Sequence, residues 1–266
     1  EDVAEYRRAS ARVDTPVLEL KGLARRGHYE DISLAICEGE IVGVSGLQGC
    51  GAEALARGLF GLERWGIGGV RLNGRPFTAR TPKEALAQGL AYLPQDRARF
   101  GLVAVRPVRE NMTYTILDQL SEAVLNFVNR RKESETVSEY IGELEIVTPS
   151  QEQMVQLLSG GNQQKVIFAK LAATKPSVLL LHEPTMGVDV RAKQDIFRII
   201  DELSRQGVAI VIISSEVREL IGVCDRILVM YEGRITREFR RDLPETTPEN
   251  ILLAIEGGHH GNDSQS

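Results

Sequence analysis

A glycine-rich stretch in the first quarter of the sequence has the composition of a phosphate-binding loop. Gly46, Gly49 and Gly51 follow an apolar, strand-like run and precede a segment expected to be helical. Glycines at such a junction let backbone N–H groups close around phosphate oxygens at a helix N-terminus. In the usual pattern a Lys and a Ser or Thr follow, and they contact the phosphates and Mg²⁺. Here Ala52 and Glu53 occupy those two positions, so the predicted loop lacks its positive charge.

A second set of motifs lies in the C-terminal half. Residues 158–165 read LSGGNQQK and precede an apolar segment with helical spacing. Residues 178–189 read VLLLHEPTMGVD, an apolar strand followed by Glu183 and a G-x-D turn. A Gly-Gly turn is common by itself, whereas an eight-residue signature in order with three other motifs is very hard to obtain by chance.

In this order, the motifs resemble the nucleotide-binding cassette of ABC transporters. The match extends over about residues 17–255 and is strongest to the second, C-terminal cassette of the double-cassette ATPases of ribose-type monosaccharide importers. Further shared motifs are PQDRARFGL at residues 94–102 and ISSE at residues 213–216. One polypeptide carries both cassettes in that family. The absence of an initial Met and the charged residues 1–15 are therefore expected to mark a cut between halves.

The resemblance implies that two cassettes meet head to tail and trap two ATP molecules between them. Each ATP would lie on one partner's glycine-rich loop and be capped by the other partner's signature, where the positive end of a helix favours the γ-phosphate. Asp189 resembles the turn that bridges the two cassettes, and its type also suits the N-cap of a helix from Val190. The residues assigned to the cap are Ser159, Gly160, Gly161, Asn162 and Gln163.

The chain's own nucleotide site departs from the family pattern. His182 stands where an Asp normally supports Mg²⁺, and Ser215 replaces the usual switch His, a change common in this subfamily. Glu183, the candidate general base that polarises water, is retained. Glu53 would place a carboxylate beside the triphosphate. Like charges ~4 Å apart repel by about 1 kcal/mol in water and roughly 4 kcal/mol at an effective dielectric near 20. The residues assigned to this site are Gly46, Gln48, Gly49, Cys50, Gly51, Ala52, Glu53 and Gln95.

These departures predict weak ATP binding and little or no hydrolysis at the chain's own loop, with Mg²⁺ weakly held or absent and no confident metal ligand. Phosphoryl transfer depends on positioning and on cations that neutralise charge. A competent ATPase with a rearranged site, whose phosphate meets an unassigned Arg, remains an alternative. So does a structural or regulatory dimerisation module unconnected to transport.

Several of these residues also have a structural interpretation. Glu53 lies in the first turn of a helix, where a carboxylate favours the dipole, and Arg57 lies four residues on. His182, alone among apolar residues, is expected to be a satisfied core or edge histidine. Cys50 suits a small apolar filler. Tyr29 is the candidate for stacking on adenine, with a surface Tyr as the alternative.

Two further positions concern the metal and the membrane subunit. Gln95 matches a Gln that touches Mg²⁺ or water and links the site to the permease, or it is a plain strand-end residue. The segment through Glu110 and Asn111 resembles the surface that receives a coupling helix, and its pattern also suits a solvated helix start. The resemblance thus implies as partners another cassette, a membrane permease and, indirectly, an extracellular sugar-binding protein. The transported sugar is left open.

The elements that would position these residues alternate between strand and helix. Apolar runs at residues 41–44, 90–93, 178–181 and 208–213 predict strands of a parallel sheet covered by helices. Thr81-Pro82-Lys83-Glu84 predicts a helix start. The expected fold is a RecA-like α/β P-loop core with an antiparallel β subdomain and a helical insertion at about residues 97–160. Residues 1–15 are expected to be a linker or arm, residues 16–256 a single cassette, and residues 257–266 a disordered tail containing His259 and His260.

Composition sets the remaining bounds. The 266 residues are 42% hydrophobic and 26% charged, with a formal net charge of −5, so nucleic acid is not expected as a partner. Cys37, Cys50 and Cys224 lack metal-ligand spacing and fit a reducing compartment. No apolar run approaches the ~20 residues that cross a bilayer, and no signal peptide is visible. We expect a cytoplasmic protein that is peripheral on the inner face of the cell membrane.

Overall fold

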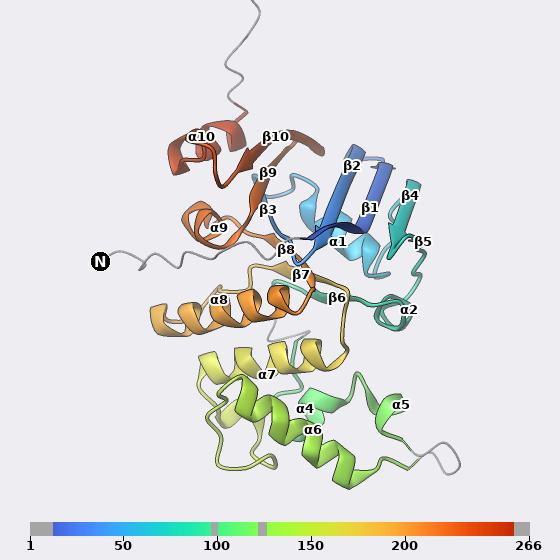
Figure 1. Cartoon of the computed structure of the whole chain (residues 1–266), viewed down its shortest axis with the longest axis vertical. Coiled ribbons are helices and arrows are strands. Elements are labelled where there is room, and N and C mark those ends of the chain that lie inside the picture. Colours follow the sequence, from blue (N-terminus) through green and yellow to red (C-terminus); the bar gives the residue numbers. More distant parts are fainter. Residues whose placement is uncertain (1–12, 97–100, 122–126, 258–266) are drawn as a thin grey trace, which may run out of the picture.

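A six-stranded sheet lies at the centre of the molecule (Figure 1). The computed structural model describes residues 13–96, 101–121 and 127–257. The strand order is β10-β9-β3-β8-β7-β6, and neighbours are parallel except in the β9–β10 hairpin. The strands are β3 (Ile41–Ser45), β6 (Leu90–Leu93), β7 (Val178–His182), β8 (Ala209–Ile213), β9 (Arg226–Tyr231) and β10 (Arg234–Arg240).

The central strands are parallel, and both of their faces are buried. Every residue of β3, β6, β7 and β8 is buried, as expected of continuous apolar runs covered on both sides. The predicted strands at residues 41–44, 90–93 and 178–181 are confirmed, and the strand predicted from residue 208 begins at Ala209. The carboxyl ends of β3, β7 and β8 consequently meet at one edge of the sheet, where Val44 and His182 both pair with Ile213.

Helices cover one face of this sheet. They are α7 (Gly160–Ala173), α8 (Val190–Arg205), α9 (Val217–Val223) and α10 (Pro248–Ile255). Their apolar sides join alternate strand residues in one buried cluster that includes Phe168, Ile196 and Ile251. Burying large apolar side chains of this kind contributes roughly 1.5–3 kcal/mol each. This layer therefore fixes the N-termini of α7 and α8 relative to the strand ends.

The opposite face packs against α1 (Ala52–Leu59) and a four-stranded antiparallel sheet in a second buried cluster. That sheet has the order β2-β1-β4-β5. Helix α2 (Pro82–Ala87) starts as predicted, because Thr81 accepts a hydrogen bond from the Glu84 amide. The strands of the four-stranded sheet are β1 (Val13–Arg25), β2 (Tyr29–Glu38), β4 (Ile67–Leu72) and β5 (Arg75–Pro76).

The boundaries of the expected arm and tail need correction. Strand β1 begins at Val13, so residues 13–15 are paired backbone and not part of a linker, because Val13 and Pro16 pair with β2. Residues 1–12 lie outside the described residues. At the other end, the Gly257 amide still donates to the Ala254 carbonyl, 3.2 Å away, in the turn after α10. The predicted tail beyond it, with His259 and His260, lies outside the described residues.

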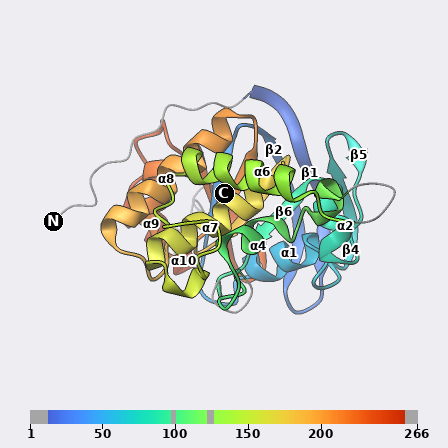
Figure 2. The same ribbon diagram turned by 90° about the horizontal axis from the view of Figure 1, so that it is seen from below.

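A helical insertion lies between β6 and α7, as predicted. It contains α4 (Val108–Thr113), α5 (Leu117–Leu120), α6 (Arg130–Glu143) and the 3₁₀ turn η1 (Val155–Leu157). Its small core joins residues of α4 and α6 to Val166 and Ala169 of α7. Seen from below, β4, β5 and α2 lie at one side of the molecule, while α8 and α9 lie at the other (Figure 2).

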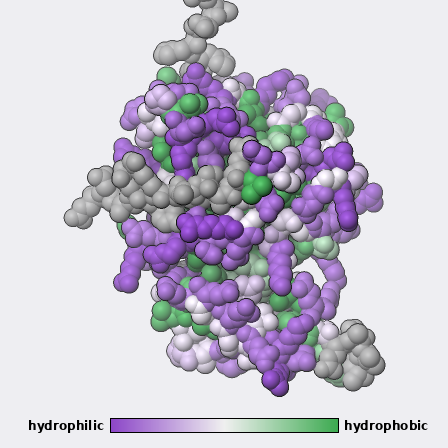
Figure 3. Space-filling view, viewed as in Figure 1, coloured by the Kyte–Doolittle hydropathy of each residue, from purple (hydrophilic) through white to green (hydrophobic). Residues whose placement is uncertain are grey.

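Hydrophilic residues cover most of the face shown in Figure 3, with hydrophobic residues scattered among them. Within residues 13–96, 101–121 and 127–257, no helix is both long and apolar enough to cross a bilayer.

Candidate nucleotide site and signature

The glycine-rich loop joins the end of β3 to the start of α1, as its sequence predicts. Gly51 is the N-cap of α1 with φ at 105°, and no side chain caps the helix. A Cβ at Gly46 would lie 2.3 Å from the carbonyl oxygen of Met230, so only glycine fits there without a shift of backbone. The loop thus places free helix N–H groups at the carboxyl edge of the sheet, which is the geometry that binds anions.

The two residues after these glycines do not supply a cation. The Ala52 side chain is 4% exposed and packs in the cluster between α1 and the sheets. The Glu53 carboxylate is exposed and lies 3.9 Å from Arg57, four residues on. Arg57 also donates to Glu63 at 2.6 Å. The structural interpretation of Glu53, an acid in the first helical turn with a basic partner, is therefore realised in the fold.

Glu183 follows β7 at this edge, and hydrogen bonds from two serines hold its side chain. It has a left-handed backbone, with φ at 48°. Its carboxylate accepts hydrogen bonds from the Ser214 hydroxyl at 2.9 Å and from the Ser215 amide and hydroxyl at 2.8 and 2.9 Å. Backbone conformations of this kind persist where surrounding contacts impose them. The serine predicted at the switch position thus binds the candidate base directly, and Ser214, which the sequence analysis did not single out, does the same.

His182 is buried, as expected, but it is not satisfied. It is 8% exposed, and its Nδ1 has no hydrogen-bond partner among the described residues. Burial lowers the pKa of the imidazole, while the nearby charges of Glu53 and Glu183 act in the opposite direction. The buried hydroxyl of Ser45, at the end of β3, also has no hydrogen-bond partner among the described residues. Two polar atoms that need a partner therefore lie at the ends of β3 and β7, the strands on either side of β8.

The residues at this edge suit ATP and Mg²⁺ unequally. The backbone of the glycine loop has the shape of a phosphate cradle. The usual Mg²⁺ ligands are oxygens, and one of the two family positions here holds the imidazole of His182. The other holds the carboxylate of Glu53, an oxygen donor that lies 3.9 Å from Arg57. Both Glu183 oxygens are already occupied by serine donors. No group of three or more His, Cys, Asp or Glu residues in the described parts of the chain is arranged to hold a metal. The donor set does not match the usual magnesium site.

Other predicted site residues lie around this loop. Gln48 and Gly49 are exposed on it. Gln95 is exposed after β6, and its amide contacts the Met186 sulfur at 3.7 Å. The half-buried Cys50 fits the filler interpretation, and burial raises the pKa of its thiol.

Two expectations made from sequence for exposed positions are wrong. Tyr29 is neither a stacking platform nor a surface residue. Its ring is 3% exposed, its hydroxyl donates to the Trp65 carbonyl at 2.6 Å, and burial raises its pKa to about 12. Asn111 is fully buried, and its amide bonds to the carbonyls of residues 103, 106 and 107, so it orders the loop before α4. Glu110 is half-buried and near Arg106.

The signature forms the N-terminus of α7, a helix of 14 residues. The Ser159 hydroxyl is its N-cap and accepts from the Asn162 amide groups, with the side-chain contact at 2.9 Å. The Asn162 side-chain oxygen in turn accepts from the Val147 amide at 2.8 Å. Gln163 donates to the Leu158 carbonyl at 3.0 Å. Ser159 and Gly160 are exposed, so the start of α7 is accessible from outside the chain.

The structure brings the signature and Asp189 together. Asp189 caps α8 by accepting from the Ala192 amide at 3.0 Å, so its N-cap interpretation is confirmed. A Cβ at Gly161 would lie 2.9 Å from that of Ala192, and glycine therefore permits the close approach of α7 and α8. Ser159, Gly161, Asn162 and Asp189 line one groove of about 560 Å³, which contains no residue of the Gly46–Glu53 loop.

One hydrogen bond joins the two groups of residues. Gln164, on the buried side of the signature helix, donates to the Pro184 carbonyl at 2.7 Å. Pro184 directly follows Glu183. This hydrogen bond therefore links the first turns of α7 to the residue next to the candidate base. Gln164 lies in the LSGGNQQK motif and could have been singled out from the sequence. Its partner, the Pro184 carbonyl, could be identified only from the fold.

Comparison with known proteins gives a consistent result. The ABC transporter family model matches residues 29–186. A putative ribose/galactose/methyl galactoside import ATP-binding protein of Rhizobium etli is 42% identical over 243 residues, which are 91% of this chain and 46% of that protein. The ribose import ATP-binding protein RbsA of Bacillus subtilis is 40% identical over 253 residues, 95% of this chain and 50% of that protein. The chain thus spans about half the length of the curated relatives it matches.

Solved structures show the same fold. A nucleotide-free ATP-binding cassette from an ABC transporter matches with a TM-score of 0.71 at 22% identity, covering 90% of this chain and 95% of that one. The protein cbiO1 of Clostridium perfringens, part of the cbiONQ transporter complex, matches with a TM-score of 0.73 at 20% identity and covers 91% and 94%. With its glycine loop, signature and flanking strands placed as in this fold, the chain belongs to the ABC transporter family as an ATP-binding cassette.

Proposed function

We propose that this chain is the ATP-binding cassette of a sugar importer that works mainly as one half of a cassette pair. Its signature completes the ATP site of a partner cassette, and its own glycine loop binds ATP weakly and hydrolyses it little. The partner is the other cassette of a longer protein. Closure and opening of the pair drive a membrane permease, which receives its sugar from a sugar-binding protein. The printed names of the relatives support ribose- or galactose-type monosaccharides as the cargo.

One contrast carries this proposal. The signature groove lies at two capped helix starts, because Ser159 caps α7 and Asp189 caps α8, and Ser159 and Gly160 are exposed there. The chain's own loop has no cation at position 52, a carboxylate at position 53 and a buried histidine after β7. Phosphate needs positive charge near the loop, so the signature is the better prepared of the two phosphate-facing surfaces. As a cytoplasmic subunit it would sit on the inner face of the membrane.

Titration calorimetry of Mg-ATP into this chain tests the first half. We expect no detectable heat at high micromolar nucleotide. Tight binding, with turnover that Glu183→Gln abolishes, would instead favour the competent ATPase, with phosphate charge met by an Arg so far without a role.

Turnover measured with the partner cassette tests the second half. Ser159→Arg places a bulky cation where the partner's γ-phosphate would lie, and we expect turnover to fall at least tenfold. Ser150→Arg, an exposed serine in the loop before η1, is the matched control. Unchanged turnover in Ser159→Arg would favour a dimerisation module with no part in the chemistry.

A further inference from the structure

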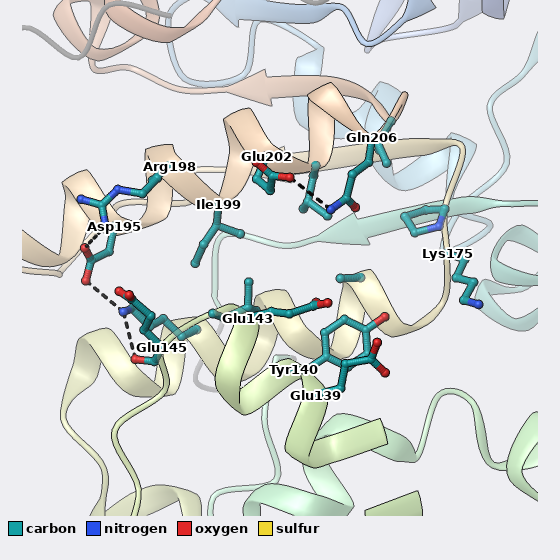
Figure 4. A pocket seen from close by; sticks show the side chains of 16 residues that line it. Glu139, Tyr140, Glu143, Glu145, Lys175, Asp195, Arg198, Ile199, Glu202 and Gln206 are labelled. Atoms are coloured by element: carbon teal, nitrogen blue, oxygen red, sulfur yellow. Dashed lines mark hydrogen bonds and ion pairs between the residues drawn. The ribbon is translucent and has the colours of Figure 1, made fainter. Parts of the chain in front are cut away.

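A groove of about 740 Å³ separates the helical insertion from the sheet-covering helix α8 (Figure 4). Its walls are α6 and α8, and the end of α7 lies between them. Its apolar lining includes Tyr140, Leu144, Ile199 and Leu203. The Lys165–Asp195 ion pair, at 3.0 Å, lies at the end shared with the signature groove. Most of this groove is thus distinct from the surfaces that face nucleotide.

The charges along this groove are unbalanced. Lys165 and Arg198 both pair with Asp195. Lys175 is the remaining cation of the lining. Against it stand four carboxylates that make no ion pair within the described parts of the chain, those of Glu139, Glu143, Glu145 and Glu202. An apolar floor with acidic walls suits a segment that carries both apolar and basic side chains.

The start of the described chain lies at the other end of this groove. Val13, the first residue of β1, pairs with Glu38. A Cβ on Gly207 would lie 2.8 Å from the Glu38 carboxylate, and the Gly39 amide donates to the Gly207 carbonyl at 3.3 Å. Gln206, immediately before Gly207, lines the groove. Val13, where the described chain begins, therefore lies near the end of the groove that Gln206 lines.

Of the preceding twelve residues, the half nearer Val13 has the matching chemistry, while the acids Glu1, Asp2 and Glu5 all lie in the farther half. The twelve residues read EDVAEYRRASAR, with Arg7, Arg8 and Arg12 in the half nearer Val13 and a tyrosine at position 6. Extended, they reach up to about 40 Å, whereas the α8 wall from Asp195 to Gln206 is only about 16 Å long. We propose that residues 1–12 occupy this groove, with Arg7 and Arg8 against Glu139 and Glu143. So placed, the segment holds α6 against α8 and braces the insertion against the sheet.

Photo-crosslinking in the full chain tests this placement. Benzoylphenylalanine replaces Tyr6, and mass spectrometry maps the product after irradiation. We expect crosslinks within one chain to peptides containing residues 139–145 or 195–206, with a yield that falls several-fold when salt screens the ionic contacts. Crosslinks to other peptides, crosslinks between two copies, or none at all would each overturn the proposal.

A charge exchange keeps the test independent of any loss of folding. In the same labelled chain, Glu139→Arg with Glu143→Arg should lower the groove crosslink at least threefold. Adding Arg7→Glu and Arg8→Glu should restore it. Glu135→Arg, on α6 outside the groove lining, is the matched control and should leave the yield unchanged. Circular dichroism and Tm confirm folding of each variant. If the exchange fails to restore crosslinking in folded chains, the ionic contact is refuted.

Discussion

Glu53 shows how one residue can serve a helix and oppose a ligand. Its carboxylate favours the dipole of α1 and lies 3.9 Å from Arg57. The same negative charge faces any phosphate bound at the loop, where like charges repel by about 1–4 kcal/mol at contact distances. Arg57 offsets little of this repulsion, because it also bonds to Glu63. Nucleotide affinity at this loop should therefore respond strongly to residue 53.

Replacing Glu53 by Ser should raise nucleotide affinity about tenfold or more, since it removes a repulsion of that size. Titration calorimetry with Mg-ATP measures the change. Glu249→Ser is the matched control, because Glu249 is likewise an exposed acid in the first turn of a helix, α10. Equal affinities for wild type and Glu53→Ser would mean that Glu53 does not oppose phosphate.

Lys170 is a buried amine without a carboxylate partner in the described hydrogen bonds. It is 6% exposed, and it donates to the Gly101 carbonyl and to the Tyr114 hydroxyl, the latter at 3.1 Å. Burial lowers its pKa from 10.5 to about 8. The protonated form is therefore disfavoured in the folded state, by about 3 kcal/mol at most.

The free energy of unfolding should rise with pH between about 8 and 10, because the unfolded chain binds the proton more tightly there. Urea denaturation of wild type and Lys170→Met at each pH isolates this effect, and the variant should lose up to about 3 kcal/mol of the rise. Lys83→Met removes an exposed amine and should keep the wild-type slope. Parallel curves for wild type and Lys170→Met would contradict the assignment.

At the scale of elements, the buried Glu133 joins α4 to α6. It accepts from Arg109 and Arg130, both at 2.9 Å, and from the Thr113 hydroxyl at 2.9 Å. Burial tends to raise the pKa of this carboxyl, but its hydrogen bonds and cationic partners prevail and hold it below the usual value. The stabilisation is thus present at neutral pH and is lost as pH falls through the folded pKa.

Glu133→Ala should lower the free energy of unfolding by roughly 2 kcal/mol at neutral pH, since it removes the acceptor shared by Arg109, Arg130 and Thr113. Arg109 then keeps only its ion pair with the exposed Glu152. The difference from wild type should shrink in acid. Urea denaturation at pH 7 and pH 4 measures both. Glu135→Ala removes an exposed partner of Arg131 in the same helix and should leave the free energy of unfolding nearly unchanged, because exposed ion pairs contribute little. A pH-independent difference would show that packing and not charge is responsible.

Elements with strong local signals could be predicted, and those that depend on distant partners could not. The run at residues 178–181 is apolar on both faces and becomes β7. Residues 13–15 gave no strand signal and join β1 because β2 pairs with them. Helix α10 was not predicted, although Thr247-Pro248 repeats the Thr81-Pro82 start of α2.

The candidate site follows the same division. The glycines, the signature and Glu183 can be identified from the sequence through its resemblance to the ABC family, because each of the motifs that carry the resemblance is local. The burial of Tyr29 depends on the Trp65 carbonyl, and the bond between Glu183 and Ser214 joins two strand ends that lie apart in sequence. The unsatisfied Nδ1 of His182 depends on what surrounds it in the fold. No local pattern contains this information.

On the scale of the whole molecule, α7 belongs to two cores at once. Phe168 and Ile167 are fully buried in the cluster beneath the central sheet. Val166 and Ala169, on another side of the same helix, complete the core of the helical insertion. The insertion cannot bury its apolar residues without a helix that the sheet also needs. The two parts should therefore unfold together, even though residues 97–160 have the appearance of a separate unit in sequence.

Phe168→Ala tests this coupling, because it removes a large side chain from the sheet side alone. We expect a loss of about 3–5 kcal/mol in the free energy of unfolding, and a matching loss of hydrogen-exchange protection in both β7 and α6. Phe127→Ala, at a site that is 70% exposed, should change neither. If protection falls in β7 while α6 keeps its own, the insertion is an independent folding unit. In that case α7 would remain helical on the insertion core, and the signature could move with the insertion while the sheet stays in place.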